Sequence, residues 1–365
     1  MPHLETVFRR SALRLPGYLA ARLWHGWWRF WIGMQQAVLF RRPRADAKDV
    51  AVYAIGSIGD FMHALPALGA IRQSHPDANI TLITNANEGD PWPMRLGIDT
   101  ALDAAIASYA NPAALREAVS GTDALYYLAP FPLRGMRSLR DMLFFALAGV
   151  RQARGFTALA PRGWVARALR PWRTQPPQYQ HLLAACGLED GRRPDLPTEA
   201  QDTPPAPYVV LAPTGKYSAQ HWPEERFIEI AKRLETAGVQ PVWVGLPADE
   251  ERVAAAGEAP GKRAFGELAF PALRALIANA GAVLSNDSGL AHIAGYAGTP
   301  VVVVSSARDA AYAWRPPSGN SPATLLRKDM NCEACSLRVC SDNACLNAIS
   351  VDEAWGALQA LLRRR

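Results

Sequence analysis

The sequence lacks a long uncharged run near its N-terminus, where residues 30–40 form the longest stretch of that segment without a charged side chain. Such a stretch is too short to cross a bilayer, which takes about 20 residues. No small-residue cleavage site follows a compact apolar run, so a secretory signal is not expected. With 49% hydrophobic and 20% charged residues, the chain of 365 residues is neither disordered nor collagen-like. These absences favour a cytoplasmic protein that is long enough for two globular domains.

Acidic residues are scarce in residues 1–48, which contain nine arginines and lysines but only Glu5 and Asp46. The net charge of +6 therefore belongs to this leader, and the rest of the chain is close to neutral. Apolar residues recur at helical spacing from residue 20 to residue 38, and polar residues mark another side of the same helix. The segment also holds four tryptophans, Trp24, Trp27, Trp28 and Trp31.

A basic, tryptophan-rich amphipathic helix is typical of segments that lie in the headgroup layer of a membrane. The leader thus predicts a peripheral protein on the inner face of the cytoplasmic membrane, without a nucleic-acid partner. The alternative is a helix that packs on the protein's own body or on another subunit.

Alternating strand and helix patterns run through the body of the chain on both sides of a proline-rich stretch. Short β-rich runs near residues 50, 79 and 124 and again near 208, 241, 282 and 300 are separated by helical patterns. This alternation predicts an α/β fold with two doubly wound, Rossmann-like domains and parallel sheets that face a central cleft. The predicted boundaries are a leader at 1–48, a first domain at 49–190, a linker at 191–207, a second domain at 208–350 and a C-terminal helix at 351–365.

The segment "SNDSGLAHIAGYAGTPVVVV", residues 285–304, leads from a strand into a helix. Asp287 and Ser288 can cap that helix, and Gly289 lets the backbone come close to a ligand. A helix that starts there presents free N–H groups to an anion, and His292 lies one turn further along. The alternative is an ordinary capped helix with a buried histidine.

Three segments, "GSIGDFMHALPAL" (56–68), "KYSAQHWPEERFIEIAKRL" (216–234) and "NDSGLAHIAGYAGTPVVVV" (286–304), together resemble glycosyltransferase family 9, the lipopolysaccharide heptosyltransferases. The resemblance covers roughly residues 50–350 and does not include the leader. It implies a GT-B fold and an inverting, metal-independent transfer without a catalytic cofactor. The implied partners are an ADP-heptose-like donor and a lipid-linked glycan acceptor such as lipopolysaccharide core.

Within this resemblance, Asp60 matches the proposed catalytic base of the family. Gly56 and Gly59 would leave room for a sugar beside it. Asp287, Ser288, Gly289 and His292 match the family's donor-binding motif. A helix dipole lowers the pKa of an aspartate, so the strength of Asp60 as a base would have to come from its position and from partial desolvation. The alternative is that Asp60 is only the N-cap of its helix.

The chain departs from the family's pattern at Gln220, where relatives commonly carry a lysine for the donor phosphates. Glutamine can donate a hydrogen bond but brings no positive charge. Lys216, in the same loop, is the candidate to replace that charge, together with the backbone of Thr214 and Gly215.

Three further groups are candidates with open alternatives. Arg134, Arg137 and Arg140 could face an anionic acceptor or be a solvated surface. Arg308, Tyr312 and Trp314 could touch the nucleotide or belong to a structural loop. Cys332, Cys335, Cys340 and Cys345 form a C-x2-C-x4-C-x4-C cluster that could hold a structural zinc or iron–sulfur centre, form disulfides or remain as packed thiols.

Two other functions compete with sugar transfer. A nucleotide-sugar epimerase could use the same scaffold, although the Gly-Asp turn of the first domain would then be superfluous. A degenerate, non-catalytic transferase that acts as a binding or scaffold protein is the other alternative, which Gln220 and the leader motivate.

Overall fold

The computed structural model describes most of the chain, and its residues fall into two compact units. The first unit consists of Met1–Gly56, Ala64–Met94 and Ile98–Pro194, and the second of Ser57–His63, Arg95–Gly97 and Asp195–Arg365. Side chains are described from residue 16 onward. The described residues are 2–85, 92–109, 111–128, 135–157, 168, 178–189, 193–199, 204, 207–309, 315–316, 322–328, 330, 335 and 337–363.

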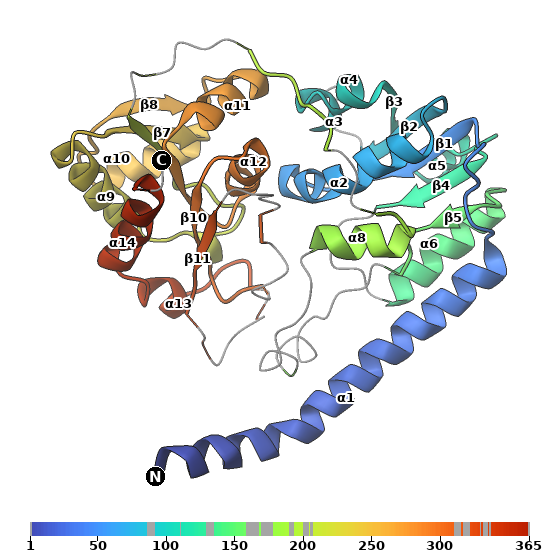
Figure 1. Cartoon of the computed structure of the whole chain (residues 1–365), viewed down its shortest axis with the longest axis horizontal. Helices are drawn as coiled ribbons and strands as arrows, with labels where there is room; N and C mark the ends of the chain where they lie inside the picture. The colour runs from blue at the N-terminus through green and yellow to red at the C-terminus, as the bar shows by residue number, and fades with distance from the viewer. Residues whose placement is uncertain are drawn as a thin grey trace. The chain divides into compact units, whose positions relative to one another are not determined.

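The first unit is built on a sheet whose described part has five parallel strands in the order β3-β2-β1-β4-β5 (Figure 1). These strands are β1 (Asp49–Tyr53), β2 (Asn79–Asn85), β3 (Ala104–Tyr109), β4 (Ala124–Tyr127) and β5 (Ala153–Arg154). In register, Val52 of β1 lies between Leu82 and Tyr126. Stacked rings fill the core beside the sheet, with centroids 5.1 Å apart for Tyr53 and Tyr127 and 4.3 Å apart for Tyr127 and Phe156.

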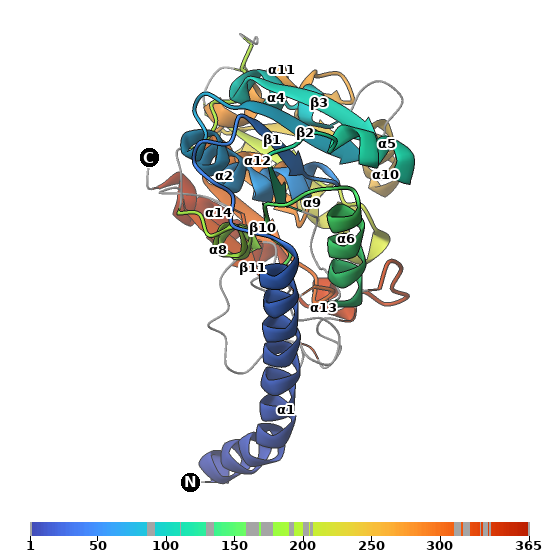
Figure 2. The same ribbon diagram turned by 90° about the vertical axis from the view of Figure 1, so that its right-hand side faces the viewer.

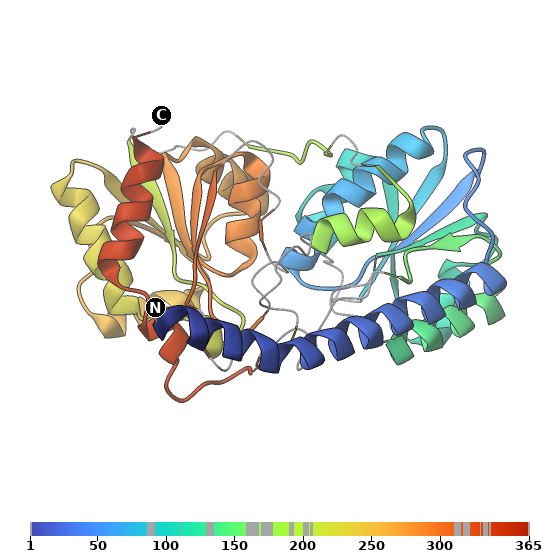
Figure 3. The same ribbon diagram turned by 60° about the horizontal axis from the view of Figure 1, so that its bottom comes forward.

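Helices connect these strands, as parallel pairing requires. The connecting helices are α2 (Ile58–Ser74), α3 (Trp92–Arg95), α4 (Ile98–Leu102), α5 (Pro112–Ala118) and α6 (Gly135–Leu147), and a further helix, α8 (Gln178–Cys186), follows β5. The long helix α1 (Pro2–Leu39) precedes them and runs beside α6, as Figures 2 and 3 both show. In the part of the chain that is described, no helix is long and apolar enough to cross a membrane.

One face of α1 is buried in the first unit, and another is exposed. Ala21, Ile32 and Gln36 are buried, and the Oε1 atom of Gln36 accepts a hydrogen bond from the N–H of Phe156 at 3.2 Å. The exposed face carries large apolar side chains, namely Leu19, Leu23, Trp24, Trp27, Phe30, Trp31, Met34 and Val38. The buried face of α1 thus includes a residue of the polar stripe seen in the sequence, Gln36. Most side chains of the apolar stripe are not covered by the described residues.

The second unit has a sheet whose described strands are all parallel, in the order β11-β10-β9-β6-β7-β8 (Figure 1). The strands are β6 (Tyr208–Ala212), β7 (Gln240–Gly245), β8 (Lys262–Phe265), β9 (Ala282–Asn286), β10 (Val301–Val304) and β11 (Ala323–Leu326). The other elements are η2 (Ser218–Gln220), α9 (Glu224–Thr236), α10 (Pro247–Ala256), α11 (Phe270–Asn279), α12 (Gly289–Ala297), α13 (Ala344–Asn347) and α14 (Val351–Leu362).

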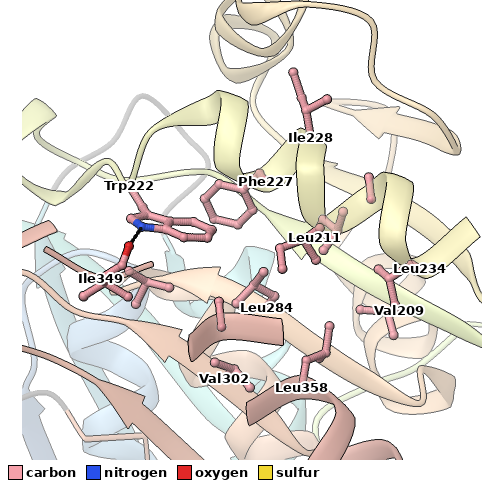
Figure 4. Close-up of a cluster of buried hydrophobic side chains, with 14 of the residues drawn as sticks. Val209, Leu211, Trp222, Phe227, Ile228, Leu234, Leu284, Val302, Ile349 and Leu358 are labelled. Carbon is pink, nitrogen blue, oxygen red and sulfur yellow. Dashed lines mark hydrogen bonds between the residues drawn. The ribbon is translucent and has the colours of Figure 1, made fainter. Parts of the chain in front are cut away.

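The core of the second unit ties the loop after β6 to the C-terminal helix. Trp222 is fully buried against Phe227, and its indole N–H donates to the carbonyl of Ile349 at 3.0 Å (Figure 4). Val209, Leu211, Leu284 and Val302 supply the sheet side of this core. The loop that leads from β6 to α9 therefore rests on a rigid base.

Candidate active site

The candidate donor site lies at the carboxyl edge of the second sheet. Because β10, β9 and β6 are neighbours and parallel, the loops that follow them meet at one edge. β6 lies in the middle of the strand order. The strands β7 and β8 follow it on one side, and β9, β10 and β11 follow it on the other. Ligands in open α/β sheets bind at such a switch point.

Asp60 stands in the first turn of α2, two residues after the helix begins. Its Oδ2 atom accepts hydrogen bonds from the N–H and the hydroxyl of Ser57, at 2.7 and 2.8 Å. Asp60 is therefore not the N-cap that the sequence left open. It reaches back from the third helical position, as the acid of a capping box does. Its Oδ1 atom accepts no hydrogen bond from a described residue.

Desolvation is the main influence on the Asp60 carboxyl. Burial raises its pKa above the ordinary value, while the two bonds from Ser57 and the charge of Lys216 lower it. A raised pKa means a stronger base. The desolvation that the sequence argument required is thus present, and it outweighs the hydrogen bonds that favour the ionised form.

The first turn of α2 packs against the first turn of α12 within the second unit. A Cβ on Gly289 would lie 2.1 Å from Cγ2 of Ile58, and a Cβ on Gly59 would lie 3.2 Å from Cδ2 of His292. The rings of His63 and His292 meet edge to face, with centroids 4.6 Å apart. Gly59 and Gly289 therefore accommodate protein neighbours, whereas the sequence interpretation assigned their missing side chains to a ligand.

Both histidines are buried, and burial keeps them neutral near pH 7. The pKa of His292 falls to about 4, and that of His63 falls well below its ordinary value. The neighbouring His292 also lowers the pKa of His63, since two positive charges at this distance repel. The pair is therefore a neutral contact between the two turns.

Asp287 follows β9 and faces the end of β10. Its Oδ2 atom accepts a hydrogen bond from the hydroxyl of Ser305 at 3.2 Å. Burial, with a smaller contribution from Asp309, raises its pKa to about 7. The carboxyl is therefore part protonated near neutrality.

The expectation that the side chains of Asp287 and Ser288 cap α12 is wrong. Ser288 occupies the N-cap position with extended backbone, but its side chain makes no capping hydrogen bond. Its hydroxyl lies 3.1 Å from that of Ser285, and the Asp287 carboxyl is turned to Ser305. The first turn of α12 is thus left without a side-chain cap among the described residues, which keeps its N–H groups available to an anion.

The loop after β6 is fastened to β9 by Asn286. This buried side chain accepts a hydrogen bond from the N–H of Trp222 at 3.1 Å and donates one to the carbonyl of Pro213 at 2.9 Å. Gln220 donates from Nε2 to the carbonyl of Asp287 at 3.1 Å. The glutamine that replaces the expected lysine therefore links two loops of the candidate donor site.

The same loop folds back on itself beside Thr214 and Gly215. His221 Nε2 lies 2.9 Å from the carbonyl of Gly215, and a Cβ on Gly215 would lie only 2.7 Å from the His221 ring. Lys216 is exposed, and its ammonium lies 5.6 Å from the centroid of the Tyr217 ring. The loop thus holds Lys216 on the same edge as Asp287.

The predicted acceptor-side arginines are engaged within the first unit. Arg140 pairs with Asp141 at 2.6 Å, and Arg137 lies 3.8 Å from the same carboxylate, which also accepts the Tyr127 hydroxyl. Arg134 lies outside the described residues. Gly56 follows β1, and its N–H donates to Oδ1 of Asn85 at 3.1 Å.

The cysteine cluster is described only in part. Cys345 is buried and its sulfur accepts the N–H of Ala307, while Cys340 donates to Asp342. Cys332 lies outside the described residues, as do Tyr312 and Trp314. Among the residues that are described, no three His, Cys, Asp or Glu side chains form a metal-binding group. The metal centre considered from the spacing stays a prediction.

Sequence reasoning did not single out Ser57, His63 or Asn286. Ser57 lies directly before α2 and three residues before Asp60, and a serine so placed before an acid is a recognisable capping signal. Nothing local distinguishes His63 or Asn286 from ordinary buried residues, because their partners lie more than sixty residues away.

Part of the chain is similar in sequence to known proteins. Residues 186–345 match the family model "Glycosyltransferase family 9 (heptosyltransferase)". Lipopolysaccharide heptosyltransferase 3 of Escherichia coli is 32% identical over 120 residues, a match that covers 31% of this chain and about a third (35%) of that protein.

Two solved structures share the fold. The family 9 glycosyl transferase of Veillonella parvula has a TM-score of 0.62 at 17% identity, over 87% of this chain and 98% of that one. The Escherichia coli heptosyltransferase WaaC with ADP-2-deoxy-2-fluoro heptose has a TM-score of 0.55 at 17% identity, over 86% and 99%.

Two parallel-stranded α/β units that match these structures define a GT-B fold, which confirms the predicted fold class. The resemblance to glycosyltransferase family 9 is confirmed as well, because residues 186–345 match the model of that family.

Proposed function

We propose that the protein is an inverting glycosyltransferase that moves a heptose from an ADP-activated donor to a lipid-linked glycan. The observation that carries this proposal is the Asp60 carboxylate, with one oxygen fixed by Ser57 and the other without a hydrogen bond in the described chain. A base needs one lone pair free and a fixed orientation. Asp60 has both, and its pKa is raised.

In this proposal Asp60 takes the proton of the acceptor hydroxyl as that oxygen forms a bond to the anomeric carbon. The bond between that carbon and the diphosphate breaks on the opposite side, and the nucleoside diphosphate leaves with the electron pair. The step inverts the anomeric centre and needs no metal in this scheme. The uncapped start of α12 and the exposed charge of Lys216 favour the leaving diphosphate electrostatically.

The donor assignment rests on the domain that matches family 9 and on the Escherichia coli relatives. Asp287, Gly289 and His292 lie in that domain at the edge where ligands of α/β sheets bind. An ADP-heptose analogue is the ligand of the solved WaaC neighbour. An ADP-sugar is therefore the first donor to assay.

The membrane assignment rests on α1. Its exposed face combines Trp24, Trp27 and Phe30 with the basic residues of the leader. Aromatic rings and guanidinium groups suit the boundary between headgroups and acyl chains. The proposal places the protein on the inner face of the cytoplasmic membrane, where a glycolipid acceptor would be within reach.

A transfer assay tests the proposed reaction. The purified protein should convert ADP-heptose and a heptose-acceptor glycolipid into an extended glycan plus ADP, with inverted anomeric configuration by NMR and with full activity in EDTA. Isomerised donor without transfer would favour an epimerase. Donor binding without any turnover would favour a scaffold protein.

A vesicle sedimentation assay tests the membrane contact. Replacing Trp24, Trp27 and Trp31 by serine should release the protein from phosphatidylglycerol vesicles, because the apolar anchor is removed. The packed face with Ile32 and Gln36 stays intact in this variant, so the fold should persist. Wild-type binding should weaken with salt. Unchanged sedimentation of the variant would contradict the assignment.

A further inference from the structure

Three cations surround the ring of Tyr217 beside the candidate donor site. The Cζ atoms of Arg308 and Arg338 lie 4.6 and 5.5 Å from the ring centroid, and the Nζ atom of Lys216 lies 5.6 Å from it. Each distance is within the range of a cation–π contact. The three side chains come from the loop after β6, the loop after β10 and the segment before α13.

Among the described residues, the cations at this ring outnumber the carboxylates that pair with them. Arg308 pairs with Asp309. Lys216 and Arg338 are exposed and form no ion pair with any carboxylate in the described part of the chain. Like charges at such distances repel, and the ring offsets only part of that repulsion. An anion with more than one charge would balance the cluster.

The segment that carries Arg338 is fastened to the donor loop. The N–H of Ala219 donates to the carbonyl of Arg338 at 3.3 Å, and Nδ2 of Asn343 donates to the carbonyl of Ser218 at 3.2 Å. Arg308 donates from Nε to the carbonyl of Leu337 at 2.6 Å. Residues 337–343 are thus held on the candidate donor loop over a separation of more than a hundred residues.

We infer that Arg338, with Arg308 and Lys216 around Tyr217, binds the diphosphate of the nucleotide-sugar donor. This inference rests on the proposed function and deepens it. The cluster supplies the positive charge that Gln220 does not bring, and it assigns a role to the cysteine-bearing segment, which presents Arg338. Lys216 stands on the loop of Gln220, and Arg308 stands on the loop of Ser305, which bonds Asp287. The donor's diphosphate therefore fits the cluster better than an acceptor phosphate does.

Calorimetry with ADP, adenosine and inorganic pyrophosphate tests the inference. Arg338→Ala should weaken ADP and pyrophosphate about tenfold, as expected for one charge-assisted contact, and should leave adenosine within about twofold. Arg338→Lys should restore part of the loss because it keeps the charge. Tyr217→Leu should weaken ADP as well, since it removes the ring that collects the cations. Arg363→Ala, an exposed arginine at the end of α14, is the matched control and should bind ADP like the wild type.

Two results overturn the inference while the proposed transfer stands: an unchanged ADP affinity in Arg338→Ala, or an equal loss for ADP and adenosine, which would indicate a structural role. Thermal unfolding of each variant identifies any that is misfolded. If Arg338→Ala is misfolded, the ADP affinity of Arg338→Lys is the deciding measurement. If the wild type binds neither ADP nor UDP nor pyrophosphate, the proposed donor and the inference fail together.

Discussion

The turns that begin α2 and α12 look alike in sequence and differ in chemistry. Each follows a strand, each has a glycine in its first helical residues, and each carries an aspartate whose pKa is raised by burial. Asp60 lies inside its helix, and among the described residues its carboxylate is bound only by Ser57 of the same turn. Asp287 lies before its helix and is bound to two other loops, through its carboxyl to Ser305 and through its carbonyl to Gln220. The first arrangement suits a proton acceptor, and the second suits an anchor for a bound donor.

The largest effect should come from removing the base. Asp60→Asn should lower the turnover number by about 10² to 10⁴, the usual cost of losing a general base. Asparagine keeps the acceptor oxygen for Ser57, so ADP affinity should stay close to that of the wild type. Steady-state kinetics with ADP-heptose and calorimetry with ADP measure the two effects. Asp352→Asn, an exposed carboxylate on α14, is the control. A fully active Asp60→Asn variant would leave Asp60 with its capping role alone.

The matching change in the other turn should act on binding. Asp287→Ala should weaken donor binding about 10- to 100-fold, because it removes the carboxyl that orders Ser305 at the end of β10. The rate constant of a single turnover at saturating donor should change less than the affinity. Isothermal titration beside rapid-quench transfer separates the two. An effect on rate alone would make Asp287 a second catalytic carboxyl. It would contradict the proposed difference between Asp60 as a base and Asp287 as an anchor for the donor.

The glycines test how closely the two turns pack. Gly289→Ala should destabilise the protein by about 1 to 3 kcal/mol, because the new Cβ would collide with Ile58. Gly59→Ala should cost less, since its Cβ would be 3.2 Å from the His292 ring. The double variant Ile58→Ala, Gly289→Ala should unfold at a higher urea concentration than Gly289→Ala alone. If the second substitution brings no recovery, the turns do not meet through these residues.

A further expected effect is on the pH dependence of stability. The folded pKa of Asp287, about 7, lies above its unfolded value, so the folded protein retains a proton that the unfolded chain has lost. This contribution to the unfolding free energy is complete below the unfolded pKa and is lost as pH rises through 7. Urea unfolding from pH 5 to 8 measures the unfolding free energy of both proteins. The value for Asp287→Asn should rise relative to that of the wild type up to about pH 7, and the difference should then stay constant. Parallel curves for the two proteins would indicate an ordinary pKa.

Much of the fold could be predicted from local patterns. Uniformly apolar runs such as those of β6 and β10 mark buried parallel strands, and the periodic helices α9 and α14 show their apolar faces in the sequence. The edge strand β11 was not predicted because it is short and only half-buried. Packing of α1 on the protein's own body was one of two alternatives, but the sequence did not reveal which face is buried, because a polar residue, Gln36, lies in it.

The site could be predicted only where a motif is continuous in the chain. Asp60, Asp287 and His292 were singled out as candidates because each lies within a short segment that resembles the family. The contacts of Tyr217 with Arg308 and Arg338 leave no local signal, because they join residues far apart in sequence. The packing roles of Gly59 and Gly289 were misjudged because a glycine in a sequence does not reveal which atoms approach it.

The most direct test of Asp60 as the base is the pH dependence of the turnover number in wild type and in Ser57→Ala. Ser57 lowers the pKa of Asp60 through its hydroxyl, so removing the hydroxyl should raise that pKa further. The rate should fall as Asp60 becomes protonated, and this acid limb should move to higher pH in Ser57→Ala while its plateau stays of the same order. Asp287 makes no hydrogen bond to Ser57 and would not shift the limb in this way. An acid limb at the same pH in both proteins, or no acid limb at all, would contradict the account.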